Sequence, residues 1–151
     1  MIENNKINEN DARRILTDLS AKAYEEVAAG DVEMGRAHFA MIRAERSIIV
    51  RDALGDPVGV LGAYEFPMRT WSVFGFQTFR FDKHWREVTK AAARAKRDLI
   101  ADGATRIQAM SLASHTDTHR WLRFLGLTFE VDCPSYGSNG EDFKMFAWIG
   151  G

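Results

Sequence analysis

Apolar residues recur every three or four positions along the first third of the chain, which is typical of helices with one buried face. The spacing predicts three helices, at residues 11–19, 20–30 and 31–46. Asn10 or Asp11 can cap the first, because a short polar side chain can accept a hydrogen bond from an unpaired first-turn N–H. The side chains expected to face the core are Ala12, Ile15, Leu16, Leu19, Ala23, Tyr24, Val27, Phe39 and Ile42.

From Ser47 the pattern changes to alternating or continuous apolar residues, which favours strands. The sequence predicts strands at residues 47–53 and 58–64, joined by a hairpin turn at Leu54-Gly-Asp-Pro57. A third strand is expected at residues 70–79. Its apolar side chains lie on both faces, which indicates a covered, central strand.

A long helix is predicted at residues 83–101, with Asp82 as its cap, and a fourth strand at residues 105–111. A crossover helix normally joins parallel strands, so we expect the third and fourth strands to be parallel. The apolar line of the helix is Trp85, Val88, Ala92, Ala95 and Leu99. The opposite line is cationic, and we interpret it as a solvated face: Lys83, Arg86, Lys90, Arg94 and Arg97.

The last third predicts a short helix at residues 115–126 and strands at 127–133 and 141–149. Ser114 or Thr116 can cap the helix, and Gly126 can end it because glycine readily adopts a positive φ. Between the two strands, Asn139-Gly140 is a strong hairpin signal.

Composition indicates a single soluble, intracellular domain. The chain has 151 residues, of which 46% are apolar, and its formal charge is −1. Cys133 is the lone cysteine, no apolar run approaches a membrane span of ~18 residues, and the N-terminus lacks a signal-peptide core. We expect a flexible N-terminus at residues 1–10 and one domain at residues 11–151.

The predicted order of elements resembles the GNAT acetyltransferase fold, in which residues 120–127 correspond to the end of the fourth helix. The chain is more specifically similar to the GNAT-like internal virion proteins of short-tailed bacteriophages, which are also described as acetyltransferases. The passages that carry this similarity are residues 11–15, Trp71, residues 120–127 and residues 136–143. The resemblance implies a single α/β (α+β) domain with a mixed, twisted sheet and helices on both faces.

Two signatures of the catalytic members of this fold are missing. Their Gln/Arg-x-x-Gly-x-Gly/Ala turn, which lets backbone N–H groups approach a pyrophosphate, is replaced by Phe79–Arg86, with no glycine and with the anionic Asp82. Their tyrosine acid, four residues before the signature glycine, corresponds to Leu122, which cannot donate a proton. The acetyl-CoA site is therefore expected to be degenerate.

Two functions stay open. The first is a virion-associated or virion-assembly protein, located in the virion and/or the host cytoplasm, that binds other phage virion or host proteins. The alternative is an acetyl-CoA-dependent N-acetyltransferase without a metal, with Glu65 as general base and Tyr136 as acid. Its cofactor-binding candidates are Phe76, Gln77, Thr78, Lys83, His84 and Arg86. Nucleic-acid binding through the cationic helix face is a weaker third interpretation, since no aromatic residues interleave with the cations.

Two further patterns carry chemistry in other proteins. His115 and His119 lie four residues apart and could share a metal, but no third ligand is nearby, so we expect surface or capping histidines. Cys133 could act as a nucleophile, but a semi-buried strand thiol is favoured because no partner residue can be identified.

Overall fold

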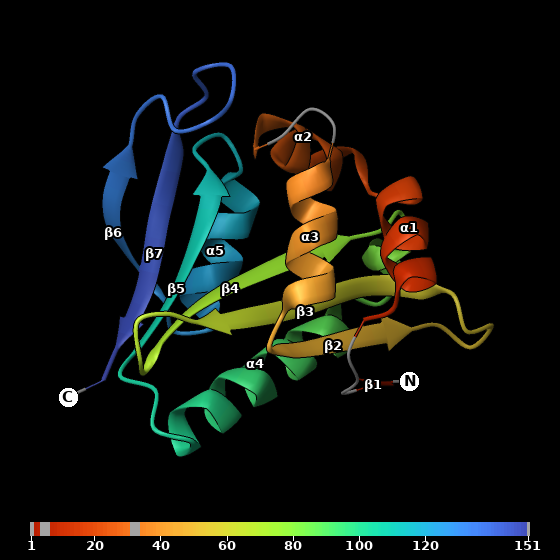
Figure 1. Cartoon of the computed structure of the whole chain (residues 1–151), viewed down its shortest axis with the longest axis horizontal. Helices are drawn as coiled ribbons and strands as arrows, with labels where there is room; N and C mark the ends of the chain where they lie inside the picture. Colours follow the sequence, from red (N-terminus) through yellow and green to blue (C-terminus); the bar gives the residue numbers. More distant parts are fainter. Residues whose placement is uncertain (1, 4–6, 31–33, 151) are drawn as a thin grey trace.

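The computed structural model describes residues 2–3, 7–30 and 34–150 and contains a mixed sheet with helices on both faces, as predicted. The seven strands have the order β1-β2-β3-β4-β5-β7-β6, and β4 and β5 form a parallel pair (Figure 1). The strands are β1 (Ile2–Glu3), β2 (Arg46–Arg51), β3 (Pro57–Glu65), β4 (Thr70–Gln77), β5 (Arg106–Leu112), β6 (Thr128–Cys133) and β7 (Phe143–Ile149). The helices are α1 (Glu9–Thr17), α2 (Ala21–Gly30), α3 (Gly35–Arg43), η1 (Phe81–Lys83), α4 (Trp85–Ala101) and α5 (Thr116–Phe124).

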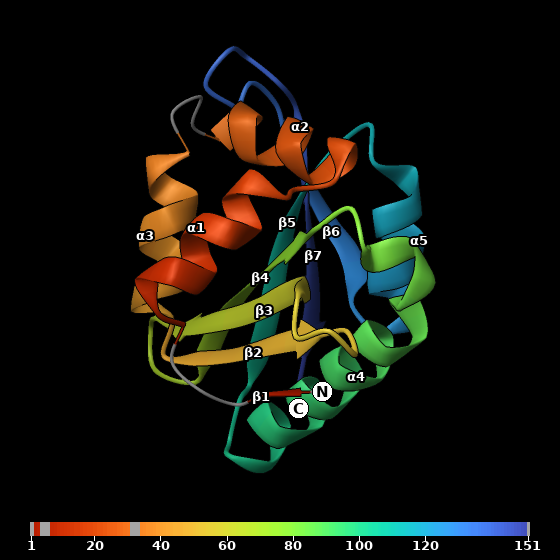
Figure 2. The same cartoon turned by 90° about the vertical axis from the view of Figure 1, so that its right-hand side faces the viewer.

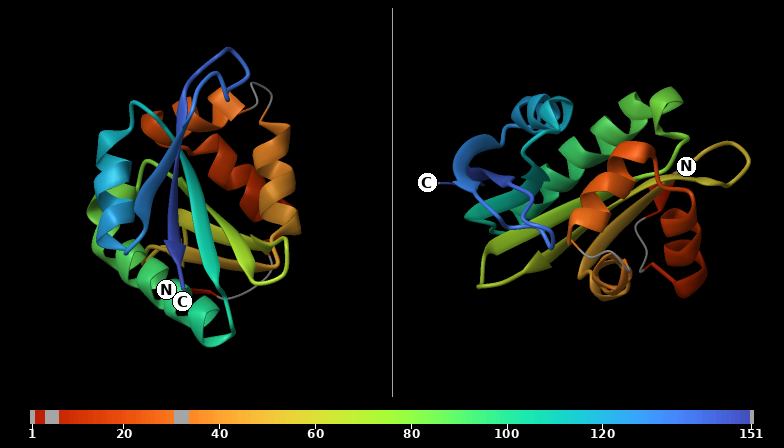
Figure 3. Two further views of the ribbon diagram at one scale, coloured as in Figure 1. Left: turned by 90° about the vertical axis from the view of Figure 1, so that its left-hand side faces the viewer. Right: turned by 90° about the horizontal axis from the view of Figure 1, so that it is seen from above.

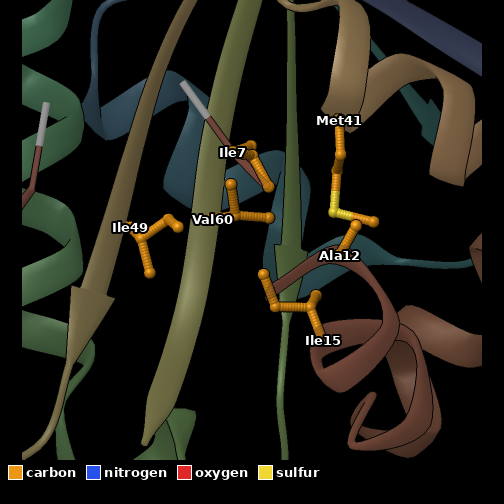
Figure 4. Packing of buried hydrophobic residues seen from close by; sticks show 6 residues of the cluster. All are labelled: Ile7, Ala12, Ile15, Met41, Ile49 and Val60. Atoms are coloured by element: carbon orange, nitrogen blue, oxygen red, sulfur yellow. The ribbon is translucent and has the colours of Figure 1, made fainter. Parts of the chain in front are cut away.

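The sheet separates two apolar layers. Helices α1, α2 and α3 lie on one side of it, and α4 and α5 on the other (Figure 2). Figure 4 shows the core of the first layer, where Ile15 and Met41 pack toward Val60 of β3. In the second layer α4 packs on β2 and β3 through Val88 and Ala91. The period-two alternation of β3 and β4 supplies apolar side chains to both layers, which is why the sheet can be covered on both faces.

The predicted boundary at residue 10 falls inside the first helix. Ile2 and Glu3 pair with β2, and Ile7 is 2% exposed, so folded structure precedes residue 11. Helix α1 begins at Glu9, and its cap is Asn8, whose side chain accepts a hydrogen bond from the Asp11 backbone N–H at 2.8 Å. Both predicted caps are therefore wrong: Asn10 and Asp11 lie within the first turn.

Two aromatic residues expected in the core are on the surface. Tyr24 of α2 and Phe39 of α3 are 53% and 62% exposed, while the smaller Ala23, Val27 and Ala37 are buried. The buried side of α3 also carries Met41, which is fully buried in the core. Part of the range expected for the third helix, residues 31–33, lies outside the described residues.

The helices on the other side also begin differently from the prediction. A turn of 3-10 helix, η1, precedes α4, so His84 rather than Asp82 occupies the N-cap position. Trp85, expected in the apolar line, is half exposed. His115 occupies the N-cap of α5 in place of the predicted Ser114 or Thr116. Gly126 follows α5 with a φ of +89°, which confirms it as the residue that ends this segment.

Candidate active site

A V-shaped opening separates β4 from β5. In the described ladder the two strands pair in parallel over three positions, from Thr70↔Arg106 to Ser72↔Gln108, and then diverge. Figure 1 shows the two strands running together at one end and spreading apart toward α2, and Figure 3 shows the same opening from two other sides. In the part of the chain that the structure describes, β5 is no longer paired with β4 beyond Gln108. On its other edge β5 pairs with β7 along its whole length. The second half of β4 therefore faces a gap.

The backbone of β4 presents hydrogen-bonding groups to this gap. The bonds from Phe66 N to Thr70 O and from Thr78 N to Val58 O show that even-numbered positions of β4 face β3. Because backbone groups alternate in direction along a strand, the N–H and C=O groups of Val73 and Gly75 point the other way, where β5 has departed. Such a row of amide groups matches an extended chain that carries amides of its own.

A cavity of about 790 Å³ occupies the opening. It lies within the range of ~300–1,000 Å³ that small-molecule sites usually have. It runs beneath α4, passes Val73 and Gly75 and reaches α5 and Glu26 of α2. A smaller cavity of about 190 Å³ lies beside Glu26 and is lined by Ser72, Phe74, Gln108, Met110 and Phe143, among others. The two cavities share Glu26 and the β4 backbone.

The N-terminus of α4 lies next to the end of β4. Among the described residues, its N-cap His84 makes no side-chain capping hydrogen bond, so the first-turn N–H groups are not capped from that position. The positive end of the helix dipole also favours an anion there. Lys83 and Arg86 are exposed beside it, as is Asp82, and none of these residues lines the large cavity. The other cations of the predicted line, Lys90, Arg94 and Arg97, are exposed along α4.

Three predicted cofactor-binding residues at the end of β4 have different positions. Phe76 and Gln77 line the large cavity. Thr78 is fully buried instead, and its hydroxyl is hydrogen-bonded to the carbonyl oxygens of Pro57 at 2.7 Å and Val58 at 2.9 Å. Its hydroxyl therefore holds β4 against β3 and is turned away from a ligand. Of the aromatics in this segment, the exposed Phe79 and Trp85 do not line the large cavity, whereas the partly buried Phe81 does.

The structure does not bring the two predicted catalytic residues to the opening. Glu65 lies at the closed end of the V, where its carboxylate accepts a hydrogen bond from Arg69 N at 2.9 Å. Tyr136 lies on the exposed loop before β7 with its ring against Phe143. Neither residue lines the large cavity or the smaller one. Leu122 is buried at the wall of the large cavity, so the position of the family's acid carries no proton donor here.

Three acidic residues of the described chain line the large cavity, Glu26, Glu45 and Asp98, and of these Glu26, which sequence reasoning missed, also lines the smaller cavity. Its Oε1 accepts a hydrogen bond from Leu112 N at 2.8 Å, and this bond ties α2 to the end of β5. Burial raises the pKa of the Glu26 carboxyl, and the bond from Leu112 N opposes part of that rise. One signal could have found it: Glu26 lies beside the apolar Ala23 and Val27, so a charge falls on the inward side of the helix.

The prediction of surface or capping histidines holds for position alone: His115 occupies the N-cap of α5 but its side chain makes no capping hydrogen bond among the described residues, and both His115 and His119 are buried. His119 is 4% exposed, and its Nε2 donates to Leu112 O at 3.0 Å, since a carbonyl can only accept. His115 is 5% exposed, and neither ring nitrogen has a hydrogen-bond partner among the described residues. The nearest carboxylate oxygens belong to Glu25, at 3.4 Å from Nε2, and Glu26, at 3.9 Å from Nδ1.

The described residues hold no group of three or more potential metal ligands, and no described helix is long and apolar enough to cross a membrane. Cys133 is partly buried at the end of β6.

The raised pKa of Glu26 makes stability depend on pH. The folded protein favours the protonated Glu26 carboxyl. Its contribution to stability is fully present below the unfolded-state pKa, about 4.3, and is lost as pH rises through the higher folded-state pKa. Glu26→Gln removes this loss while its side-chain oxygen can still accept from Leu112 N. We expect the variant to gain stability relative to the wild type as pH rises above about 4, measured by urea unfolding at successive pH values. A difference that does not change with pH would contradict this assignment.

No protein-family model matches the chain, and no curated protein sequence is significantly similar to it. Solved structures share its fold along nearly its whole length. A ribosomal-protein-alanine N-acetyltransferase from Brucella melitensis has a TM-score of 0.73 at 14% identity, with 99% of each chain covered. A GNAT-family acetyltransferase from Bacillus anthracis has a TM-score of 0.70 at 14% identity, covering 98% of this chain and 94% of its own. A Bacillus subtilis acetyltransferase in complex with CoA has a TM-score of 0.71 at 12% identity, covering 98% and 97%. These likenesses confirm the predicted GNAT fold, and at such identities they show the fold alone.

Proposed function

We propose that the protein binds acetyl-CoA in the opening between β4 and β5 and transfers its acetyl group to an amine. The observation that carries this proposal is the divergence of the two strands after Ser72 and Gln108, with the backbone of Val73 and Gly75 facing a cavity of about 790 Å³. A protein that used this fold purely for docking would have no need to keep that backbone uncovered. The GNAT acetyltransferases of the same fold, one of them in complex with CoA, support the proposal.

The residues present fit such a ligand in two places. The amide groups of Val73 and Gly75 match the two amides of a pantetheine arm. The start of α4, with Lys83 and Arg86 beside it, would hold the phosphates, although Asp82 reduces the positive charge there. When bound, acetyl-CoA supplies an activated acyl group as a thioester. The chain's own contribution is to orient that group and to accept a proton from the amine.

The missing glycine turn changes how phosphates are held and leaves the opening itself in place. In Phe79–Arg86 the chain makes a 3-10 turn, and the Arg80 guanidinium is held by Asp18 at 2.9 Å and by the Pro57 carbonyl at 3.2 Å. Arg80 is therefore committed to the fold. This leaves the helix N-terminus and the exposed Lys83 and Arg86 as the groups available to an anion.

Calorimetric titration with acetyl-CoA tests the proposal directly. Binding should raise the free energy of unfolding by roughly 2.7 kcal/mol at a hundredfold excess of ligand over Kd. A thermal-unfolding scan with and without the ligand measures the same effect, and CoA and free adenosine diphosphate serve as partial ligands. The absence of both heat and thermal shift at millimolar acetyl-CoA would overturn the proposal.

A role in virion assembly stays a prediction, because none of the matched structures bears on it. It would become the leading hypothesis if acetyl-CoA did not bind. Co-purification with defined phage virion proteins would then be its test.

A further inference from the structure

We propose that Glu26 accepts the proton of the amine that is acetylated and passes it through His115 to Glu25 and the solvent. The inference rests on the proposed function and adds to it the residues that move the proton. Glu26 would be the catalytic residue, because it touches the amine, and His115 would be the relay. The substrate class is a primary amine that arrives as an ammonium ion.

The position of Glu26 supports the first step. It is the carboxylate shared by the linings of both cavities, so it stands where the opening between β4 and β5 passes from the α4 side of the sheet to the α2 side. The hydrogen bond from Leu112 N at 2.8 Å fixes one of its oxygens. The other oxygen lies toward His115, 3.9 Å from Nδ1. An anion held at this point attracts an ammonium ion and can then take its proton.

The burial of His115 supports the second step. Both ring nitrogens of His115 are buried without a hydrogen-bond partner among the described residues, which lowers the stability of the protein. Buried polar groups are normally hydrogen-bonded, so such an exception calls for a functional explanation. The two nitrogens of His115 face two different carboxylates, Glu26 on the cavity side and Glu25, which is 63% exposed. The three groups therefore form a line from the cavity to the solvent. Their separations exceed normal hydrogen-bond distances, as catalytic contacts often do before a substrate is bound.

The charges around this line are mixed. Lys22, one turn before Glu26 on α2, is paired with Asp117 of α5 at 3.5 Å, and it lowers the pKa of the Glu26 carboxyl weakly. Ser111 of β5 also lowers the pKa of the Glu26 carboxyl, and His119 faces Leu112 O beside it. Glu25 and Glu26 thus place negative charge on the α2 side of the opening, where the smaller cavity is otherwise mostly apolar. A small amine with an apolar substituent matches this combination.

The proton balance of the reaction is simple. The ammonium ion first gives one proton to Glu26, and that proton leaves through His115 and Glu25. The free amine nitrogen then forms its bond to the acetyl carbon while the carbon–sulfur bond breaks, its electron pair going to sulfur. The second proton, lost from nitrogen as the amide forms, neutralises the sulfur. The net products are an amide, a thiol and one proton released to solvent.

The kinetic test compares the wild type with Glu26→Gln, which retains the shape and the bond to Leu112 N. Thiol release from acetyl-CoA is followed with 2-phenylethylamine, spermidine and an alanine-terminated peptide as probe amines. We expect unchanged acetyl-CoA affinity and a roughly 10²–10⁴-fold lower kcat/KM near pH 7. The deficit should shrink as pH rises, because the amine then arrives already deprotonated. Glu9→Gln, on the exposed start of α1, is the matched control and should leave both quantities unchanged.

A second readout needs no acceptor. In histidine-labelled protein followed by NMR at one fixed pH, the ring signal of His115 should shift in Glu26→Gln and stay in place in Glu9→Gln, since Glu26→Gln removes the carboxylate 3.9 Å from Nδ1. An unchanged His115 ring signal, or full activity of Glu26→Gln, would overturn the inference while leaving acetyl-CoA binding intact. Failure of the wild type to bind acetyl-CoA would instead overturn the proposed function.

Discussion

Replacing Gly75 with tryptophan is expected to abolish acetyl-CoA binding while leaving the protein folded. Gly75 lies on the part of β4 that faces the opening and lines both cavities. A Cβ there would meet the flexible Leu61 side chain at 3.1 Å, and no backbone closer than 3.6 Å. The indole would therefore extend into the space between β4 and α4. We expect Kd to rise roughly hundredfold or more, about 2.7 kcal/mol of binding free energy, in calorimetric titration.

The control for this variant is an equally large substitution elsewhere on the sheet. Thr128→Trp places the same side chain on the exposed strand β6, away from the opening, and should bind acetyl-CoA as the wild type does. Thermal unfolding of both variants separates blocked binding from misfolding. Normal acetyl-CoA affinity in a folded Gly75→Trp protein would place the ligand outside the opening and would contradict the proposed function.

The parts of the fold that follow from local periodicity could be predicted from the sequence. The parallel pairing of β4 and β5 followed from the long helix between them, and Gly126 followed from the need for a positive φ after α5. The errors arose where side-chain size decided the packing. Tyr24 and Phe39 look like core residues by apolarity, but α2 buries Ala23 and Val27 and α3 buries Ala37 and Met41. A one-dimensional pattern does not show how close two backbones come.

From the sequence, the candidate site was expected at one strand and one helix end, but the carboxylate that we propose for it was not among the expected residues. The order of elements placed Phe76 and Gln77 at the end of the central strand, and both line the large cavity there, while their part in cofactor binding stays a prediction. Glu26 was missed because its partner, Leu112, is 86 residues away along the chain. Glu65 was preferred since it ends a strand, but that strand end lies where β4 and β5 are still paired. Glu26 lies where β4 and β5 have diverged, and Glu65 lies where they are still paired, so the direction in which the V opens distinguishes them.

The strongest effect on stability is expected from Phe146→Ala, because this side chain holds α5 on the sheet. Phe146 of β7 is 1% exposed and packs against Leu122 and Leu127, with its ring 5.0 Å from that of His119. Its removal leaves a cavity under α5, which should lower the free energy of unfolding by about 3–5 kcal/mol and the melting temperature by roughly 6–20 °C.

Phe124→Ala is the matched control, since Phe124 lies on α5 itself but is 78% exposed. It should change the free energy of unfolding by no more than about 0.5 kcal/mol. Urea unfolding at neutral pH measures both variants. The same packing also positions function, because α5 carries His115 at its N-cap and contacts Leu112 O through His119. In Phe146→Ala the His115 ring should therefore lose its fixed position between Glu25 and Glu26, seen as a broadened or shifted ring signal by NMR. An unaltered signal in a strongly destabilised variant would show that the relay geometry is held by α2 and the end of β5 alone.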